Sequence, residues 1–173
     1  MIGGGNNNVA EGQSSTIAGG FSLSAFGNCS TITGGISSKA QGNSSFAGGG
    51  QQNDSRGNCS AVVGGVMNEA INDFTIIGGG TKNITLSSYG AILGGYSNTT
   101  SGSGSVIGGG LFNAASGKAS VIGSGSKNTA SGNYSTIVGG LSSKATNQHT
   151  FVGGGQNNEA KFTHSFVGAG CKN

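Results

Sequence analysis

The sequence predicts an all-β parallel β-solenoid, because it has a strict 15-residue repeat, apolar residues spaced two apart and glycine at fixed places in each repeat. Written in rows of fifteen from Met1, its 173 residues give eleven full repeats and eight residues of a twelfth, without insertion or deletion. We number the repeats as coils 1 to 12 and the residues of each as positions 1 to 15. Residues 1–173 are therefore expected to form a single repeat domain.

The first half of each coil predicts a short strand followed by a turn. Position 2 is aliphatic in all twelve coils, with eight Ile, three Val and one Ala, and Ser usually precedes it at position 15. A spacing of two is that of a strand, whereas a helix needs apolar residues three and four apart and tolerates little glycine. Glycine fills position 5 in every coil and position 4 in ten, which predicts a turn whose backbone requires glycine at both positions.

The second half of each coil repeats this template and predicts a second inward-facing strand. Position 8 is Asn in nine of twelve coils, position 10 is Ala in eight of eleven, and position 12 is Gly in seven of eleven. Equivalent side chains then stack along the rod at the strand spacing of about 4.8 Å. We expect the stacked Asn amides to form hydrogen bonds up and down the rod.

The outward positions of the two strands differ in character. Position 1 is apolar in nine of twelve coils, whereas positions 9 and 11 carry eight of the chain's thirteen charges, and positions 14 through 6 carry none. An uncharged apolar face requires covering. We therefore predict homo-oligomerisation through the face at positions 1 and 3, with these interface residues: Phe46, Ile76, Val106, Val121, Phe151 and Phe166.

Several classes of function are disfavoured by composition and motif. The eight Lys and Arg are scattered, without the basic stripe that nucleic acid requires. No run of 18 apolar residues predicts membrane insertion, and the segment after Met1 does not have the pattern of a secretory signal peptide. The glycine runs do not lead into a phosphate-binding motif, and no acid and base pair is evident. We therefore predict a protein that is not an enzyme and has no cofactor.

His149 and His164 both occupy position 14 in adjacent coils, so a metal site and a simple stacked ladder are both open interpretations. The ladder is favoured, because position 14 also places Phe74 next to Tyr89. The three Cys are expected to be free thiols, since the two at position 14 lie two coils apart, beyond disulfide reach.

Seven Asn-X-Ser/Thr sequons occur, and their positions separate them into two groups. Three lie at position 8, where the Asn should point inward. The other four lie in the turn at position 13 and are the candidate glycosylation sites, in a host that performs this modification: Asn28, Asn43, Asn58 and Asn133.

The half-repeats, such as SxIxGG at Ser15 to Gly20 and NxAxG at Asn113 to Gly117, resemble the head repeats of YadA-type trimeric autotransporter adhesins. They are also similar to repeats in the shafts of phage and viral fibres. The resemblance implies a left-handed β-roll, a homotrimer, an extracellular, cell-surface or virion-surface location, and an adhesive or fibre role toward a host surface protein or glycan. The adhesin repeat is usually one residue shorter, and no stalk or membrane barrel is evident here.

Two alternative functions remain from the sequence. A self-assembling extracellular filament is one, because coils without polar caps expose backbone groups that template further pairing. An ice-binding β-roll of the plant type is the other, because it uses similar NxVxG half-coils. The ice-binding interpretation is disfavoured, since Phe46, Phe151 and Phe166 interrupt the flat row of small residues that it needs.

Overall fold

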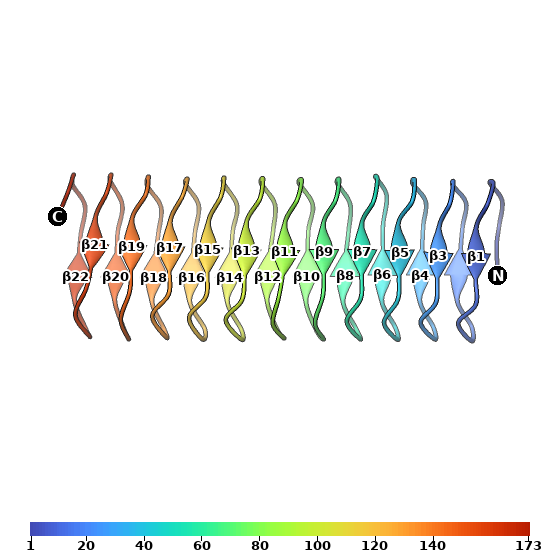
Figure 1. Ribbon diagram of the computed structural model, residues 1–173, viewed down its shortest axis with the longest axis horizontal. Helices are drawn as coiled ribbons and strands as arrows, with labels where there is room; N and C mark the ends of the chain where they lie inside the picture. The colour runs from blue at the N-terminus through green and yellow to red at the C-terminus, as the bar shows by residue number, and fades with distance from the viewer.

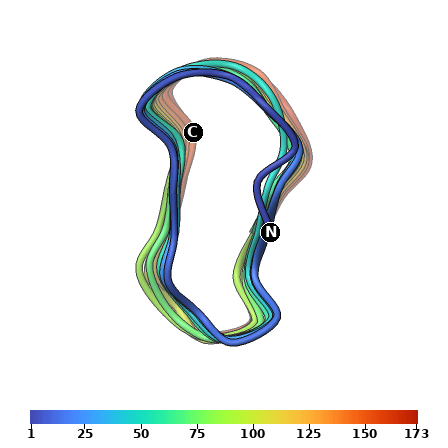
Figure 2. The same cartoon turned by 90° about the vertical axis from the view of Figure 1, so that its right-hand side faces the viewer.

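The computed structural model describes residues 1–173 and confirms a parallel β-solenoid of 15-residue coils with two short strands in each. The coils stack into a straight rod with the termini at opposite ends (Figure 1). Followed from the N-terminus in Figure 2, the chain winds left-handed around a flattened outline that barely changes from coil to coil. No helix of a kind that could cross a membrane is present.

Two parallel sheets of eleven strands run the length of the rod. The strands at positions 9 and 10 form the charged sheet, named for its outward charges: β1 (Val9–Ala10), β3 (Ser24–Ala25), β5 (Lys39–Ala40), β7 (Asp54–Ser55), β9 (Glu69–Ala70), β11 (Ile84–Thr85), β13 (Thr99–Thr100), β15 (Ala114–Ala115), β17 (Thr129–Ala130), β19 (Lys144–Ala145) and β21 (Glu159–Ala160). The strands at positions 1 and 2 form the apolar sheet: β2 (Thr16–Ile17), β4 (Thr31–Ile32), β6 (Phe46–Ala47), β8 (Ala61–Val62), β10 (Ile76–Ile77), β12 (Ala91–Ile92), β14 (Val106–Ile107), β16 (Val121–Ile122), β18 (Thr136–Ile137), β20 (Phe151–Val152) and β22 (Phe166–Val167).

Neighbouring coils pair in constant register. Each residue pairs with the one fifteen places later, as Ile77 does with Ile92 in the apolar sheet and Ala115 with Ala130 in the charged sheet. A third line of parallel bridges joins the residues at position 6, such as Phe21 and Ile36. Because the register never slips, the position number of a residue fixes its place on the contour of the rod.

The core is a thin column between the two sheets. The aliphatic residues at position 2 are fully buried from Ile17 to Val152, and the small residues at position 10 are buried opposite them from Ala25 to Ala160. Ser at position 15 and Asn at position 8 are buried as well in most coils. The predicted inward orientation of positions 15, 2, 8 and 10 is therefore confirmed.

The buried Asn side chains attach each glycine turn to the coil that follows. Asn98 shows the pattern: its amide nitrogen donates to the carbonyl oxygen of Gly94 at 3.1 Å and to that of Gly110, one coil on, at 2.9 Å. Its Oδ1 accepts the backbone N–H of Asn113 at 2.9 Å. One amide pair, Asn98 and Asn83, is also joined directly, at 3.2 Å. The amides do bond along the rod as expected, but mainly to backbone, because the turn carbonyls lie within their reach.

Glycine is required at position 5 but not at position 4. At position 5 all twelve glycines have positive φ, between 86° and 138°, and a β-carbon on Gly80 would lie 2.2 Å from the carbonyl oxygen of Gly95. At position 4 the φ angles are not positive, and a β-carbon on Gly79 would meet no atom within 4 Å. The predicted steric need for glycine at position 4 is wrong, which agrees with the Ser124 and Ala169 found there.

Two other corners have left-handed backbone that the sequence did not predict. Every non-glycine residue at positions 7 and 14 has φ between 50° and 62°, which makes 22 such residues. From coil 2 onward, the backbone N–H at these positions donates to the preceding coil, as that of Lys127 does to the Leu111 carbonyl oxygen at 2.9 Å. Closure of the coil thus imposes a conformation that side chains normally disfavour by about 1 kcal/mol or more.

Replacing a ladder asparagine tests the Asn bonds. Asn98→Ala leaves the Gly94 carbonyl oxygen and the buried backbone N–H of Asn113 in the next coil without a partner, so we expect the free energy of unfolding to fall by about 3 kcal/mol. The matched control is Asn28→Ala, where the exposed side chain accepts one hydrogen bond from the backbone of Gln13. Water can replace that bond, so the loss should stay below about 1 kcal/mol. Chemical unfolding followed by circular dichroism measures both, and equal losses would contradict the role given to the buried ladder.

Replacing a left-handed residue with glycine tests the corner strain. Lys127→Gly removes an exposed side chain with φ of 57°, so we expect thermal stability to be maintained or increased, by up to about 1 kcal/mol. Lys144→Gly, an exposed residue in β19, should lower stability by roughly 0.5 to 1 kcal/mol, because glycine weakens a strand. A lower stability for the first variant than for the second would show that the corner carries no strain.

Candidate functional site

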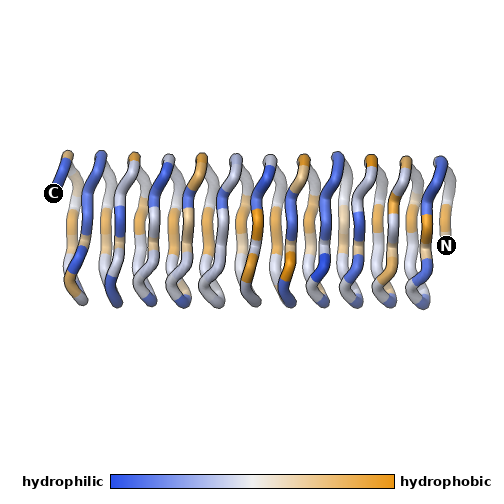
Figure 3. The backbone as a smooth tube through the Cα atoms, viewed as in Figure 1, coloured by the Kyte–Doolittle hydropathy of each residue, from blue (hydrophilic) through white to orange (hydrophobic).

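The outer face of the apolar sheet carries the six predicted interface residues in one row. Phe46, Val106 and Phe151 are half-buried, Ile76 and Val121 are about 40% exposed (42% and 37%), and Phe166 in the last coil is 71% exposed. The Phe151 and Phe166 rings stack with centroids 4.9 Å apart. Figure 3 shows hydrophobic segments recurring at one height along this sheet.

Position 3 widens this apolar face. Val63, Leu93 and Val138 expose 49%, 61% and 51% of their surface, respectively. Glycine or another small residue fills most of the remaining coils at this position. The outer face of the apolar sheet is thus continuous, uncharged and uncovered in the single chain, and it brings the predicted interface residues together.

Five of the eight charges on the charged sheet form two small salt-bridge clusters, in coils 4 and 5 and in coil 11. In coils 3 to 5, Arg56 Nε lies 2.7 Å from Asp54 Oδ2, and another guanidinium nitrogen lies 3.3 Å from Glu69 Oε2. Gln41 Nε2 also donates to Asp54 Oδ1 at 3.0 Å. The hydrogen bond to Asp54 raises the pKa of the Arg56 guanidinium above its usual value. One guanidinium is thus shared by two carboxylates, and the cluster ties the side chains of neighbouring coils together on the sheet surface.

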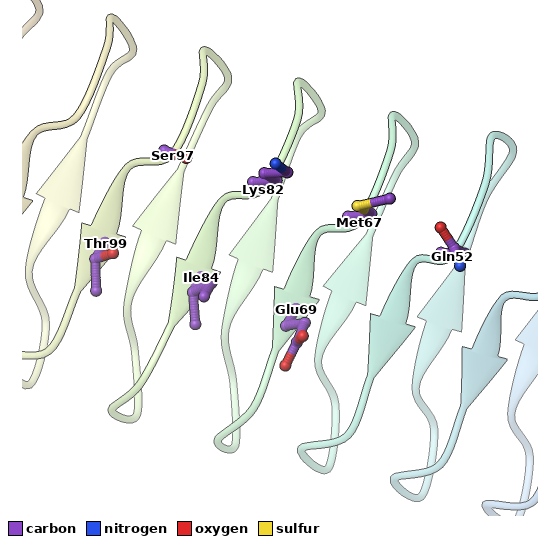
Figure 4. A pocket seen from close by; sticks show the side chains of 7 residues that line it. All are labelled: Gln52, Met67, Glu69, Lys82, Ile84, Ser97 and Thr99. Carbon is purple, nitrogen blue, oxygen red and sulfur yellow. The ribbon is translucent and has the colours of Figure 1, made fainter.

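A shallow groove lies beside the charged sheet in coils 3 to 7 and again in coils 10 to 12, between the rows of positions 7 and 9. It exists because the residue between them, at position 8, points inward. Its largest part has a volume of about 540 Å³ (Figure 4). This part is lined by Gln52, Met67, Glu69, Lys82, Ile84, Ser97 and Thr99. Three smaller hollows continue along the same two rows.

Sequence reasoning missed this groove, although the alternation of outward, inward and outward residues at positions 7, 8 and 9 signals it. The hollows are open, and their lining mixes amides, hydroxyls, single charges and a few apolar groups. The lining of the largest part holds no cysteine or histidine.

The residues at position 14 form the predicted stacked ladder. The Tyr134 and His149 rings lie 5.1 Å apart, His149 and His164 also lie 5.1 Å apart, and Phe74 lies 5.2 Å from Tyr89, all with interplanar angles of 8° or less. No three His, Cys, Asp or Glu side chains come together where they would hold a metal ion. The three cysteines are free and exposed, as expected.

The four candidate glycosylation sites lie in the exposed corner, as predicted. In Asn28, Asn43, Asn58 and Asn133, Oδ1 accepts the backbone N–H of the preceding coil, while the amide nitrogen makes no hydrogen bond. The three sequon asparagines at position 8 are buried in the core, with both ends of the amide occupied. Only the corner asparagines present a nitrogen that a glycan can reach.

No protein-family model matches the sequence, and no curated protein matches it either. The chain is therefore described by its fold, as a β-solenoid repeat protein with an apolar face, a charged face and an exposed ladder of side chains at one corner.

Proposed function

We propose that the protein is a structural and adhesive repeat module: the head or shaft of a trimeric surface adhesin or of a viral or phage fibre, acting outside the cell or on a virion. The observation that carries this proposal is the continuous, uncharged outer face of the apolar sheet. A rod of this kind spaces and displays its other surfaces and performs no chemistry. The resemblance of the half-repeats to adhesin heads and fibre shafts supports the same role.

The repeat itself favours another copy of the chain as the occupant of the apolar face. Exposed Val, Leu, Ile and Phe side chains recur there at the coil spacing of about 4.8 Å. A second rod with the same spacing contacts this face in every coil, whereas a globular partner contacts only a few. Three copies, rather than two, follow from the family resemblance.

In such an assembly the charged sheet and its groove face outward. Their lining of amide, hydroxyl and charged groups offers hydrogen bonds of the kind that sugars and extended peptides accept. We therefore place contact with a host surface protein or glycan on this side.

A charge on the apolar face tests the assembly. Val106→Asp would bury a carboxylate between copies, so we expect contact through the apolar sheet to be lost and the mass of the assembly to fall. The matched control is Ala114→Asp, which adds the same charge to an outward position of the charged sheet and should leave the mass unchanged. Analytical ultracentrifugation at micromolar concentration measures both. A monomeric wild-type chain would overturn the proposal.

The constant register favours one second candidate, a self-assembling extracellular filament. Because every coil presents the same backbone pattern to the next, rods that meet end to end can continue the ladder. Electron microscopy at increasing concentration separates the two functions. Discrete rods support the adhesin or fibre module, and fibres that lengthen with concentration support the filament.

Ice binding makes a separate prediction. The rings at Phe46, Phe151 and Phe166 break the flatness of the apolar face, so we expect no thermal hysteresis in a freezing-point assay. A measurable hysteresis gap would revive this function.

A further inference from the structure

Position 14 forms a ridge along one edge of the rod, the lower edge in Figure 1, where each coil turns from the charged sheet to the apolar sheet. Five coils place a ring on this ridge: Phe74, Tyr89, Tyr134, His149 and His164. All five are exposed, between 45% and 61% for Phe74, Tyr89 and Tyr134. The rings stack only within their own groups, two in coils 5 and 6 and three in coils 9 to 11.

Small residues occupy the ridge in the intervening coils: Cys29, Ser44 and Cys59 in coils 2 to 4, and Gly104 and Ala119 in coils 7 and 8. A β-carbon on Gly104 would meet no atom within 4 Å, so the second group forms an open notch. From coil 2 to coil 11 the order is therefore three small residues, two rings, two small residues and three rings.

Reversing this order exchanges every ring with a small residue. We propose that two copies of this chain pack antiparallel along the corner ridge, related by a twofold axis between coils 6 and 7, so that coil n of one copy faces coil 13 minus n of the other. The Phe74 and Tyr89 rings then enter the notch at Ala119 and Gly104 of the second copy. Equivalent positions face one another because a twofold axis perpendicular to antiparallel rods preserves the contour.

The charges beside the ridge give independent support for this register. Position 13 carries only two charges, Asp73 in coil 5 and Lys118 in coil 8, and neither forms a salt bridge within the chain. Coils 5 and 8 face one another in the proposed pair, so each Asp73 meets the Lys118 of the other copy. The contact thus contains two symmetric ion pairs of complementary sign.

Other arrangements of two copies lose this fit. A shift of the twofold axis by half a coil toward the N-terminus places Tyr89 on its own symmetry mate. The same shift toward the C-terminus places Phe74 against Tyr134. Both shifts separate Asp73 from Lys118. A parallel, in-register pair places every ring against itself.

The contact also leaves the outer face of the apolar sheet free, so it does not rest on the proposed function. A glycan on Asn58 or Asn133 would occupy the contact, which therefore belongs to the unglycosylated chain.

Cross-linking tests the register directly. In the proposed pair Cys59 faces Tyr134, so Tyr134→Cys should give a covalent dimer with a short bis-maleimide. Peptide mass spectrometry should show that the linkage joins Cys59 to the introduced thiol. Within one chain the two residues lie five coils, or about 24 Å, apart, so this linkage must join two copies.

Phe74→Cys is the matched control for the cross-link. Its thiol faces Ala119, and the nearest thiol of the other copy lies three coils, or about 14 Å, away, so no covalent dimer should form. A parallel, in-register pair would instead bring the introduced thiols of the two copies together. Dimers from both variants, or from neither, would overturn the register.

Charge reversal tests the contact with the protein in solution. Lys118→Asp turns each of the two symmetric ion pairs into a pair of carboxylates, so we expect the assembly mass to halve in analytical ultracentrifugation. Adding Asp73→Lys to the same chain should restore the wild-type mass. Ala119→Tyr should also halve the mass without loss of stability, since left-handed residues at position 14 already carry rings and the new ring can stack on Tyr134. Ser97→Phe, at the equivalent left-handed position 7 next to Phe112, is its control and should have no effect. An unchanged mass for Lys118→Asp would overturn the proposal.

The apolar-sheet contact and the corner contact can be disrupted by different variants. Val106→Asp removes only the assembly through the apolar sheet and leaves corner-paired dimers, whereas Lys118→Asp removes only the corner pairing. Loss of one with retention of the other therefore identifies which contact is absent.

Discussion

The in-register hydrogen-bond ladder between successive coils is the constraint on which the whole molecule depends. Of its 111 backbone hydrogen bonds, only 20 lie within the strands, so coils are joined around most of their contour rather than through the two-residue strands alone. The buried Asn residues extend this ladder to the glycine turns, where strand pairing ends. A core with one aliphatic side chain per coil suffices because every coil repeats the same bonds.

Much of this architecture was predictable from the sequence, because at several positions of the coil the structural requirement selects one kind of residue. Burial selects Ile at position 2, as at Ile77, and the positive φ of the turn selects glycine at position 5, as at Gly80. The left-handed corners were not predictable, because their residues range from Lys127 to Phe112 and share no preference for positive φ. At these corners the conformation is imposed by closure of the coil, and the residue types found there do not indicate a positive φ.

The surfaces divide in the same way. The uncharged face could be predicted, because charge and hydrophobicity at positions 1, 9 and 11 are read directly once the period is known. The alternation at positions 7, 8 and 9 signals that a groove exists, but its size could not be predicted. That size depends on how far apart the position 7 and position 9 rows lie when a residue such as Asn83 turns inward between them. The candidate glycosylation sites were separated correctly because position 8 points into the core, whereas position 13 lies in an exposed turn.

The constant register also means that the length of the rod can change only in equal steps of one coil. Gaining or losing a whole coil changes its length by one step of about 4.8 Å and leaves every hydrogen bond between the remaining coils intact, so length can drift freely in such a chain. The corner ridge does not share that freedom. Removing a single coil between Asp73 and Lys118 would leave the rod intact but would change which residues meet across the corner of the proposed pair. The corner contact therefore restricts where coils can be gained or lost, although the rod itself does not.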